Sequence, residues 1–438
     1  MNGYRISKHS IKLNYSNMLT WMFAAYMSSG LLRTVMGALL SRLHLGSYYI
    51  PASIIFIYLP FFLFVIISAM KGSQYYSILI FAAVLAIAAL IFIITYWIHP
   101  EYHEYLVRPV FGAMDAVFRP DFGAVWGFLI IIACRNSKEI FKNFRYAAIA
   151  MLVYGVYQYY VFLRTGYWYA YDYLGEWSEQ LYNLDFSYLC GFCTCVFIAQ
   201  FSRSKKLIDL FMMLLSLILM VLGGGRGAFA CFAVFLILFY LRAFILLSRR
   251  KKVIVLFIIA VAAFVIYISL PAILSSLASV NSRSIQSLLN GTFAEDNGRN
   301  RIYTLAKTAI EGVPFWGYGA FGDRPFIAPY YYWGYCHNIV YEMLIDFGWF
   351  LGIGFLSAIA IQIIYVYLHA KEYDLAVISI LVSANVKLFL SASFWTYAQF
   401  WMLLAFLLMK IIEKRKQASA FRRKYNDTSY YRPYNVYN

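Results

Sequence analysis

The sequence predicts an all-α, polytopic integral membrane protein with about twelve transmembrane helices and a long extracytoplasmic loop carrying short helices. Of the 438 residues, 63% are hydrophobic and only 13% are charged. Runs of about 20 apolar residues, the length that crosses a hydrocarbon core, recur from end to end. Tyr and Phe are also abundant, as expected where aromatic rings pack in a bundle and line both membrane interfaces.

Hydropathy places the expected spans along the whole chain. They are residues 15–33, 48–70, 75–98, 121–134, 146–163, 184–201, 207–223, 227–247, 253–272, 338–368, 375–390 and 395–412. The resulting division is a cytoplasmic N-terminus (1–14), a transmembrane bundle of about nine spans (15–272), an extracytoplasmic loop (273–337), about three further spans (338–412) and a disordered cytoplasmic tail (413–438).

The net charge of +17 follows this division. The two ends and alternate loops hold most of the Lys and Arg, including RSKK (203–206) and SRRKK (248–252). The positive-inside rule therefore puts both termini in the cytoplasm and leaves no reason to expect a nucleic-acid partner. Arg33 and Arg42 fall on the other side, so the first loop fits this topology poorly.

The polar start runs directly into a full-length apolar span without a small-residue cleavage site, so the first helix is expected to be the membrane anchor. Of the six cysteines only Cys336 falls in an outward loop, which excludes a disulfide framework. The C-x-x-C within CGFCTC (190–195) lies in an apolar span. We interpret its thiols as small buried residues rather than as a metal or redox site.

Arg226 is the one charged residue between Leu210 and Leu241, and it follows three glycines. A guanidinium at the bilayer centre costs roughly 3 kcal/mol. Residues 207–247 would measure about 60 Å as one helix, so two spans with a turn at the glycines are predicted. Arg226 then lies at the outer mouth of the bundle, either facing a ligand or bonded to nearby carbonyl groups.

A short helix is expected in the long outward segment, where Asp296 or Asn297 can cap it and Pro314 ends it. Arg299 lies in its first turn, where a cation opposes the helix dipole. A bound anion would relieve that mismatch, whereas the plain alternative is a solvated arginine. Arg301 points to a different side of the helix.

The start of the next span carries a polar stripe. Asn338, Glu342 and Asp346 recur at intervals of four residues, with His337 at the head of the stripe. An interfacial histidine is commonly structural, but one that heads an acidic stripe and faces arginines is a candidate catalytic group. Thiol catalysis by the neighbouring Cys336 is not expected, because adjacent helical residues point apart.

These segments, in this order, resemble the O-antigen ligase and O-antigen polymerase (Wzy-type) superfamily of bacterial membrane glycosyltransferases. The motifs that carry the resemblance are GGGRG (223–227), Gly298-Arg299 with Tyr303 and Pro314, Gly317-Tyr318-Gly319, His337-Asn338 and Asp346-Phe347-Gly348. They cover about residues 200–355. In one place the chain departs from the family pattern: the residue before the membrane arginine is often Ser, and here it is Gly225.

The resemblance implies a membrane glycosyltransferase, and we expect a repeat-unit polymerase for an O-antigen, capsule or exopolysaccharide. Such an enzyme transfers glycan from undecaprenyl diphosphate to a lipid-linked acceptor at the outer face of the cell membrane, with inversion, without a metal and without a cofactor. It assigns catalysis to Arg226, Arg299 and His337, the arginines holding the diphosphate and the histidine taking a proton. The expected substrate-binding residues are Arg301, Arg324, Asn338, Glu342, Asp346 and Tyr303.

Other functions stay open at this point. A ligase that transfers to lipid A-core shares every residue named above, and base rates alone favour the polymerase. A lipid-linked oligosaccharide flippase should show related halves and charges near the midplane, and the sequence shows neither. A scaffold gives no reason for His337 to face arginines. The implied partners are the lipid-linked donor, the glycan acceptor and the bilayer, with a chain-length regulator or flippase of the same pathway.

Overall fold

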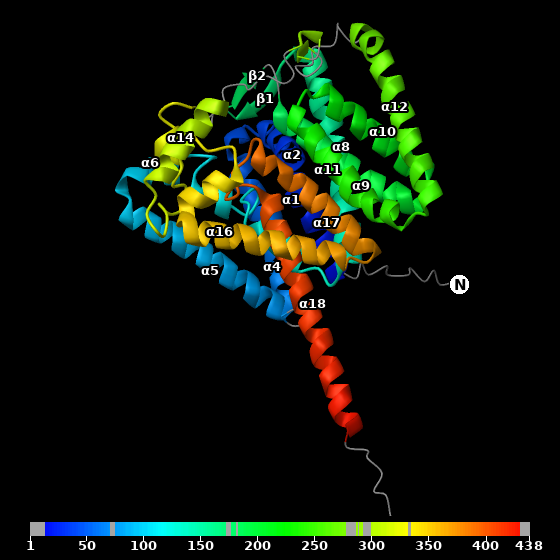
Figure 1. Ribbon diagram of the computed structural model, residues 1–438. Coiled ribbons are helices and arrows are strands. Elements are labelled where there is room, and N and C mark those ends of the chain that lie inside the picture. The colour runs from blue at the N-terminus through cyan, green and yellow to red at the C-terminus, as the bar shows by residue number, and fades with distance from the viewer. Residues whose placement is uncertain are drawn as a thin grey trace, which may run out of the picture.

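The computed structural model describes residues 14–70, 75–171, 177–180, 183–276, 286–287, 289–291, 299–331 and 334–429. Over these residues the chain is almost entirely helical, with one two-stranded hairpin (Figure 1). Among them, six helices are long and apolar enough to cross a membrane, or seven if one bent pair counts as a single span. The predicted all-α membrane class is confirmed; the count of about twelve spans is not.

The elements follow one another along the chain with short connections. The first group is α1 (Tyr15–Met27), α2 (Ser29–Ser41), η1 (Gly46–Tyr48), α3 (Tyr49–Ser53), η2 (Ile54–Tyr58), α4 (Leu59–Met70), α5 (Tyr75–Ile98), η3 (Pro100–Tyr102), α6 (His103–Val107), η4 (Met114–Phe118), α7 (Trp126–Ile132) and α8 (Ser137–Thr165). The second is β1 (Trp168–Tyr171), β2 (Trp177–Gln180), α9 (Leu184–Ser204), α10 (Leu207–Leu222), α11 (Arg226–Leu246) and α12 (Arg249–Ser276). The third is α14 (Arg299–Glu311), α15 (Arg324–Ile327), α16 (Ile339–Leu368), α17 (Glu372–Asn385), η5 (Val386–Phe389) and α18 (Ala398–Ser429).

The first expected span, 15–33, is broken. Helices α1 and α2 meet at Ser28 with a bend of 82°. The Ser28 hydroxyl donates to the Ala24 carbonyl at 2.6 Å, a bond that competes with the helical ladder. The bend places Arg33 against Asp121, a fully buried carboxylate 2.6 Å away. The position of Arg33, which fits a simple topology poorly, is explained by this buried partner.

Two expected spans are too short to cross a bilayer. The apolar run 121–134 contains α7, a helix of only seven residues whose side chains from Gly127 to Ile132 are all buried. Helix α7 packs against α18, where Gly127 leaves no room for a side chain against the Ala398 carbonyl. Helix α10 has 16 residues, fewer than the roughly 20 that a span needs. The high hydropathy of α7 reflects burial inside the protein, whereas α10 leaves Leu207, Phe211 and Ile218 exposed.

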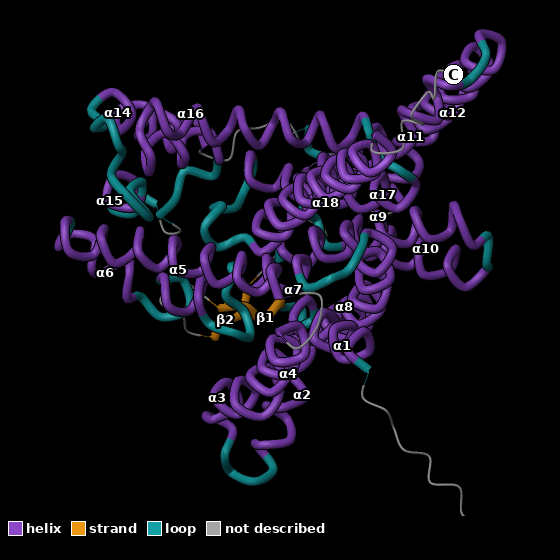
Figure 2. Tube along the Cα trace, turned by 90° about the horizontal axis from the view of Figure 1, so that it is seen from below, coloured by secondary structure: helices purple, strands orange, loops and turns teal. Residues whose placement is uncertain are grey.

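Helix α9 packs among α8, α10, α11 and α17 (Figures 1 and 2). Its thiols Cys190, Cys193 and Cys195 are buried and unoxidised, which confirms their interpretation as packing residues. The other three cysteines are also buried and free, so the predicted absence of a disulfide framework agrees with the structure.

The loops predicted to face the cytoplasm meet at one end of the bundle. Arg203, after α9, pairs with Glu372 at the start of α17 at 2.8 Å. Arg145 in α8 pairs with Asp209 in α10 at 3.2 Å. Side chains from loops far apart in sequence therefore share one charged end, as the alternation of basic loops requires.

Helix α18 projects away from the body of the molecule (Figure 1). It continues through residues 413–429, which were expected to belong to a disordered tail. The stretch EKRKQASAFRRK is rich in Lys, Arg, Gln and Ala, which favour the helix even without burial. The rest of the expected tail, 430–438, lies outside the described residues.

A β-hairpin stands in the loop between α8 and α9. Strands β1 and β2 pair antiparallel, with Trp168 opposite Gln180 and Tyr171 opposite Trp177. The Trp168 ring is buried and packs on Phe162 at 4.6 Å. The hairpin was not predicted from the sequence, and its buried Trp168 ring stabilises the fold.

Candidate functional site

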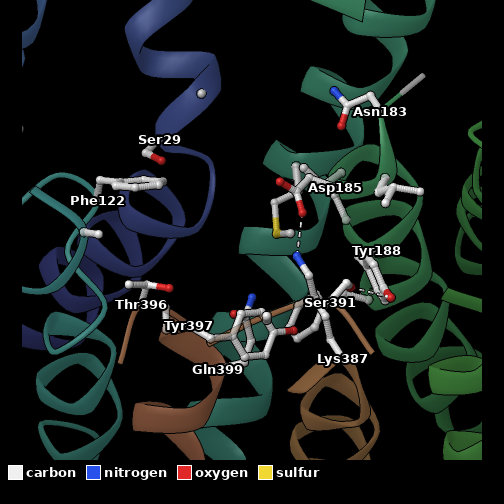
Figure 3. Close-up of a pocket in the computed structure, with 18 of the residues that line it drawn as sticks. Ser29, Phe122, Asn183, Asp185, Tyr188, Lys387, Ser391, Thr396, Tyr397 and Gln399 are labelled. Carbon is white, nitrogen blue, oxygen red and sulfur yellow. Dashed lines mark hydrogen bonds and ion pairs between the residues drawn. The ribbon is translucent and has the colours of Figure 1, made fainter. Parts of the chain in front are cut away.

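A cavity of about 1090 Å³ opens between the first turns of α9, the helix α14 and the loops before α16 and α18. Arg299 and His337 both line it, although 38 positions separate them in sequence. The opposite wall is formed by Ser29 and Phe122, which face Tyr397 and Gln399 across the space (Figure 3). Two of the three predicted catalytic side chains thus share one compartment.

His337 is held by the loop rather than by the helix that follows it. Its backbone has a left-handed φ of +53°, and the next residue, Asn338, caps α16 by accepting a bond from the Val340 amide at 2.9 Å. The imidazole packs on the Tyr335 ring at 4.2 Å. Its Nδ1 is buried, and the described residues offer it no hydrogen-bond partner. A strained loop residue with an unsatisfied ring nitrogen at a cavity suits a functional role.

Burial, together with the positive charges of Arg299 and Arg324, lowers the pKa of His337 to about 3. The imidazole is therefore neutral at pH 7, with one ring nitrogen able to accept a proton. An anion bound beside Arg299 would offset the positive field and restore basicity.

Arg299 is the first residue of α14, as the sequence predicted for its first turn. It is half-buried and lines the cavity together with Ile302 from the same helix. One face of α14 packs into the protein, because Ile302, Ala306 and Ala309 are buried. The suggested caps Asp296 and Asn297 lie outside the described residues.

The other two residues predicted from α14 do not line the cavity. Arg301 is exposed, with its guanidinium 5.8 Å above the Tyr330 ring. Tyr303 packs edge-on against Tyr341 at 5.5 Å. Arg301 and Tyr303 therefore share α14 with Arg299 but have different surroundings.

Arg324 and Glu342 belong to a buried network beneath the cavity floor. Arg324 pairs with Asp323 at 2.5 Å and lies 3.6 Å from Glu342. Ser393 accepts from Arg324 at 3.0 Å and donates to Glu342, whose second oxygen accepts from the Phe394 amide at 3.1 Å. Both charged groups are thus occupied by internal partners, and neither lines the cavity. Their geometry fits positioning of the loop after η5 better than direct binding of substrate.

Asp346 anchors the Gly-x-Gly segment to α16. Its side chain accepts from Trp395 at 2.6 Å and from the Gly322 amide at 3.0 Å. Its carbonyl accepts from the Gly319 amide at 2.9 Å. A side chain on Gly317, whose φ is +81°, would lie 2.2 Å from that carbonyl. The sequence placed this stripe correctly on one face of the helix, but the face is buried and does not line the cavity.

Arg226 begins α11 directly after the turn at Gly223 to Gly225, so the predicted turn between two helices is confirmed. The Gly225 amide donates to the Ser187 hydroxyl at 2.8 Å. A side chain on Gly227 would lie 1.9 Å from the hydroxyl of Tyr188, which lines the cavity. The glycine-rich turn therefore lies directly behind the cavity wall. Arg226 itself is half-buried and is not among the residues that line it.

Tyr188 connects these motifs. Its hydroxyl accepts from Ser391 at 2.9 Å, and Ser391 in turn accepts from the Tyr335 hydroxyl through its carbonyl at 3.0 Å. Tyr335 is the ring that packs on His337. The glycine-rich turn and the histidine loop are thus joined through one continuous wall.

Lys387 and Asp185, which were not predicted from the sequence, form an ion pair at 2.5 Å on this wall (Figure 3). A signal was available, because both residues lie in expected spans, where ionisable groups are rare and commonly functional. Their pairing depends on two helices that are far apart in sequence.

Residues 211–356 match the family model described as O-antigen ligase. This region belongs to the O-antigen ligase family. The resemblance found in the sequence is confirmed over this third of the chain, which contains Arg226, Arg299 and His337. Neither the comparison with curated proteins nor that with solved structures gives a significant match.

The O-antigen ligase region supplies only part of the cavity. Tyr335 and His337 come from it, whereas Asp185, Tyr188 and Lys387 lie outside the matched residues. Among the described residues, no group of three His, Cys, Asp or Glu side chains could hold a metal ion. The charged side chains that line the cavity beside His337 are Arg33, Asp185, Arg299 and Lys387.

Proposed function

We propose that the protein is a membrane glycosyltransferase that moves a glycan from undecaprenyl diphosphate to a hydroxyl of an acceptor. The observation that carries the proposal is the placement of Arg299 and His337 on one cavity within an O-antigen ligase family region. A guanidinium holds a diphosphate through paired, charge-assisted hydrogen bonds, and partial burial strengthens them.

The reaction needs one bond to form and one to break. The acceptor oxygen attacks the anomeric carbon while the bond from that carbon to the diphosphate oxygen breaks, and the electron pair leaves with the diphosphate. Arg299 stabilises the charge that develops there, with Arg226 as the second candidate group. His337 accepts the acceptor's proton and later returns it to water. Direct displacement inverts the anomeric centre.

In this scheme, binding of the donor diphosphate makes His337 a stronger base. The pKa of His337 is held low by burial and by two guanidinium groups, so the free site binds no proton at neutral pH. A diphosphate beside Arg299 brings negative charge and raises the basicity of His337 at the moment when the base is needed.

The acceptor separates the two functions that fit this chemistry. Extension of a lipid-linked repeat unit, as in a polymerase, is our first proposal. Transfer to a separate acceptor, as in a ligase, is the second, and the description of the matched family favours it. In both cases we place the cavity at the extracytoplasmic face of the cell membrane, with both termini in the cytoplasm.

Purified protein incubated with a lipid-diphosphate oligosaccharide tests the proposal. Growth of lipid-linked chains supports the polymerase, and transfer that requires an added acceptor supports the ligase. We expect Arg226→Ala, Arg299→Ala and His337→Ala to lose at least about 100-fold in kcat. Lys307→Ala, an exposed cation on the same helix as Arg299, should retain activity. Activity should also persist in EDTA; full turnover by Arg299→Ala would contradict the proposed mechanism.

A further inference from the structure

A lysine and an aspartate form an ion pair inside the bundle, on the wall of the cavity. Lys387 comes from η5, and Asp185 lies in the first turn of α9. The ammonium nitrogen is 2.5 Å from the carboxylate oxygen (Figure 3). An ion pair in a membrane bundle is costly to form and is a functional candidate by default.

The two partners are held very differently. The Lys387 side chain is 12% exposed and lies above the rings of Tyr188 at 4.6 Å and Tyr397 at 5.3 Å. The Asp185 side chain is 81% exposed and faces the cavity. Among the described residues, Lys387 is its one charged or hydrogen-bonding partner. The cation is therefore fixed by its surroundings, whereas the carboxylate is free to leave.

The charges that face the cavity favour an incoming anion. Arg299 and Lys387 both line it, and Asp185 is the carboxylate that opposes them. Arg33 also lines the cavity, but the buried Asp121 already neutralises it at 2.6 Å. When Asp185 turns aside, two unpaired cations remain around one compartment, which matches the two negative phosphate groups of a diphosphate.

Lys387 is connected to the candidate base. The Lys387 ammonium lies over the Tyr188 ring, whose hydroxyl accepts a hydrogen bond from Ser391. The Ser391 carbonyl accepts from the hydroxyl of Tyr335, and the Tyr335 ring packs on His337. A group that binds at Lys387 is thus held on the same rigid wall as the histidine. This continuity places the ion pair within reach of the reaction proposed above.

We propose that Lys387 and Asp185 form an exchangeable anion site. The diphosphate of the lipid-linked donor replaces the Asp185 carboxylate against the Lys387 ammonium, and Asp185 returns to Lys387 when the diphosphate product leaves. The inference rests on the proposed function, because it takes a diphosphate as the ligand. It adds a binding residue and a displacement step that lie outside the O-antigen ligase region.

Substitutions at the two positions should act in opposite directions. Binding of undecaprenyl diphosphate to the full chain in nanodiscs can be measured by thermophoresis. Lys387→Met should weaken it about 10- to 100-fold, and Lys387→Arg should restore most of the affinity. Asp185→Asn should tighten it about two- to fivefold, because the competing carboxylate is gone. In turnover, Asp185→Asn should lower both KM and kcat, because product release slows.

A purely structural ion pair predicts the opposite pattern for Asp185. Both variants would then weaken binding in step with a lower melting temperature, and that result overturns the proposal. Inorganic pyrophosphate must bind more weakly than the lipid diphosphate, and equal affinity also overturns the assignment to a lipid-linked donor. If Lys387→Met binds like wild type while wild type transfers glycan, this site fails and the proposed function stands. If the opposite-sign pattern holds but no glycan is transferred, the function fails and the site stands.

Discussion

His337 is the residue on which the candidate chemistry depends. It combines a left-handed backbone, a buried ring nitrogen without a partner and a depressed pKa. A histidine with a purely structural role is expected to satisfy both ring nitrogens. In this structure the Nδ1 atom of His337 lacks a hydrogen-bond partner among the described residues, and a ligand bound in the adjacent cavity could supply one.

Replacement of His337 by glutamine should lower kcat by about 100-fold or more, because the base is lost while a polar side chain of similar length remains. Initial rates of glycan transfer measure the effect. His369→Gln is the matched control, since His369 is exposed at the other end of α16. Equal losses in both variants would show that the substitution itself, rather than the site, is responsible.

The low pKa of His337 also predicts how stability depends on pH. The unfolded chain binds a proton on this residue near pH 6.5, whereas the folded chain does so only near pH 3. The folded-state pKa is depressed, so its contribution is fully present above pH 6.5 and is lost progressively as pH falls toward 3. Melting temperatures in nanodiscs at pH 7.5 and pH 5 should therefore differ less in His337→Gln than in wild type. An unchanged difference would contradict the neutral, buried histidine.

At the scale of elements, helix α16 is broken where the glycine-rich loop docks. Gly348 has φ +73° and ψ 174°, so the helix changes direction there. A side chain at this position would lie 2.1 Å from the Phe315 carbonyl. The Gly-x-Gly and Asp-x-Gly motifs, which the sequence offered as separate signals, are the two halves of one contact.

Gly348→Ala should therefore destabilise the protein by about 1–3 kcal/mol, through backbone strain and the clash with Phe315. Gly354→Ala provides the comparison on the same helix, because nothing lies within 4 Å of a side chain there. Its effect should stay within about 1 kcal/mol of wild type and favour the helix. Melting temperatures of the wild type and the two variants can be compared in detergent. Equal values would show that Gly348 is not needed for docking of the glycine-rich loop.

The sequence predicted elements that depend on nearby residues. The turn at Gly223, the helix at Arg299 and the polar stripe through Glu342 all follow from local spacing and glycine chemistry. The bend at Ser28 and the pairing of Lys387 could not be predicted, because both depend on contacts between distant elements. Hydropathy also could not separate a membrane span from a helix buried in protein, such as α7.

At the scale of the whole molecule, ion pairs gather at both ends of the bundle. Pairs such as Arg203 with Glu372 occupy the end that carries the basic loops, and the cavity with Lys387 and Asp185 opens toward the other. This separation supports a topology in which substrate and basic loops lie on opposite sides of the membrane.

Engineered cysteines test that topology. All six native cysteines are buried, so an impermeant maleimide should label the wild type weakly in intact cells. Glu311→Cys, at the exposed end of α14, should be labelled from outside. Lys206→Cys, in an exposed basic loop, should react only after lysis. Labelling of Lys206→Cys alone in intact cells would indicate the reverse orientation. Labelling of both positions in intact cells would contradict the proposed orientation.

Tyr188 is tightly enclosed by its neighbours. Gly227 touches its hydroxyl from behind, Ser391 bonds that hydroxyl from the side, and the Lys387 ammonium lies over its ring. Gly227 belongs to α11, whereas Lys387 and Ser391 lie in and just after η5, where the Ser391 amide donates to the Lys387 carbonyl at 2.8 Å. Two distant stretches of the chain therefore enclose this one phenol. Efforts to retune this protein toward new sugars should leave that phenol and its surroundings intact and vary the opposite wall instead, where Ser29 and Phe122 line the cavity.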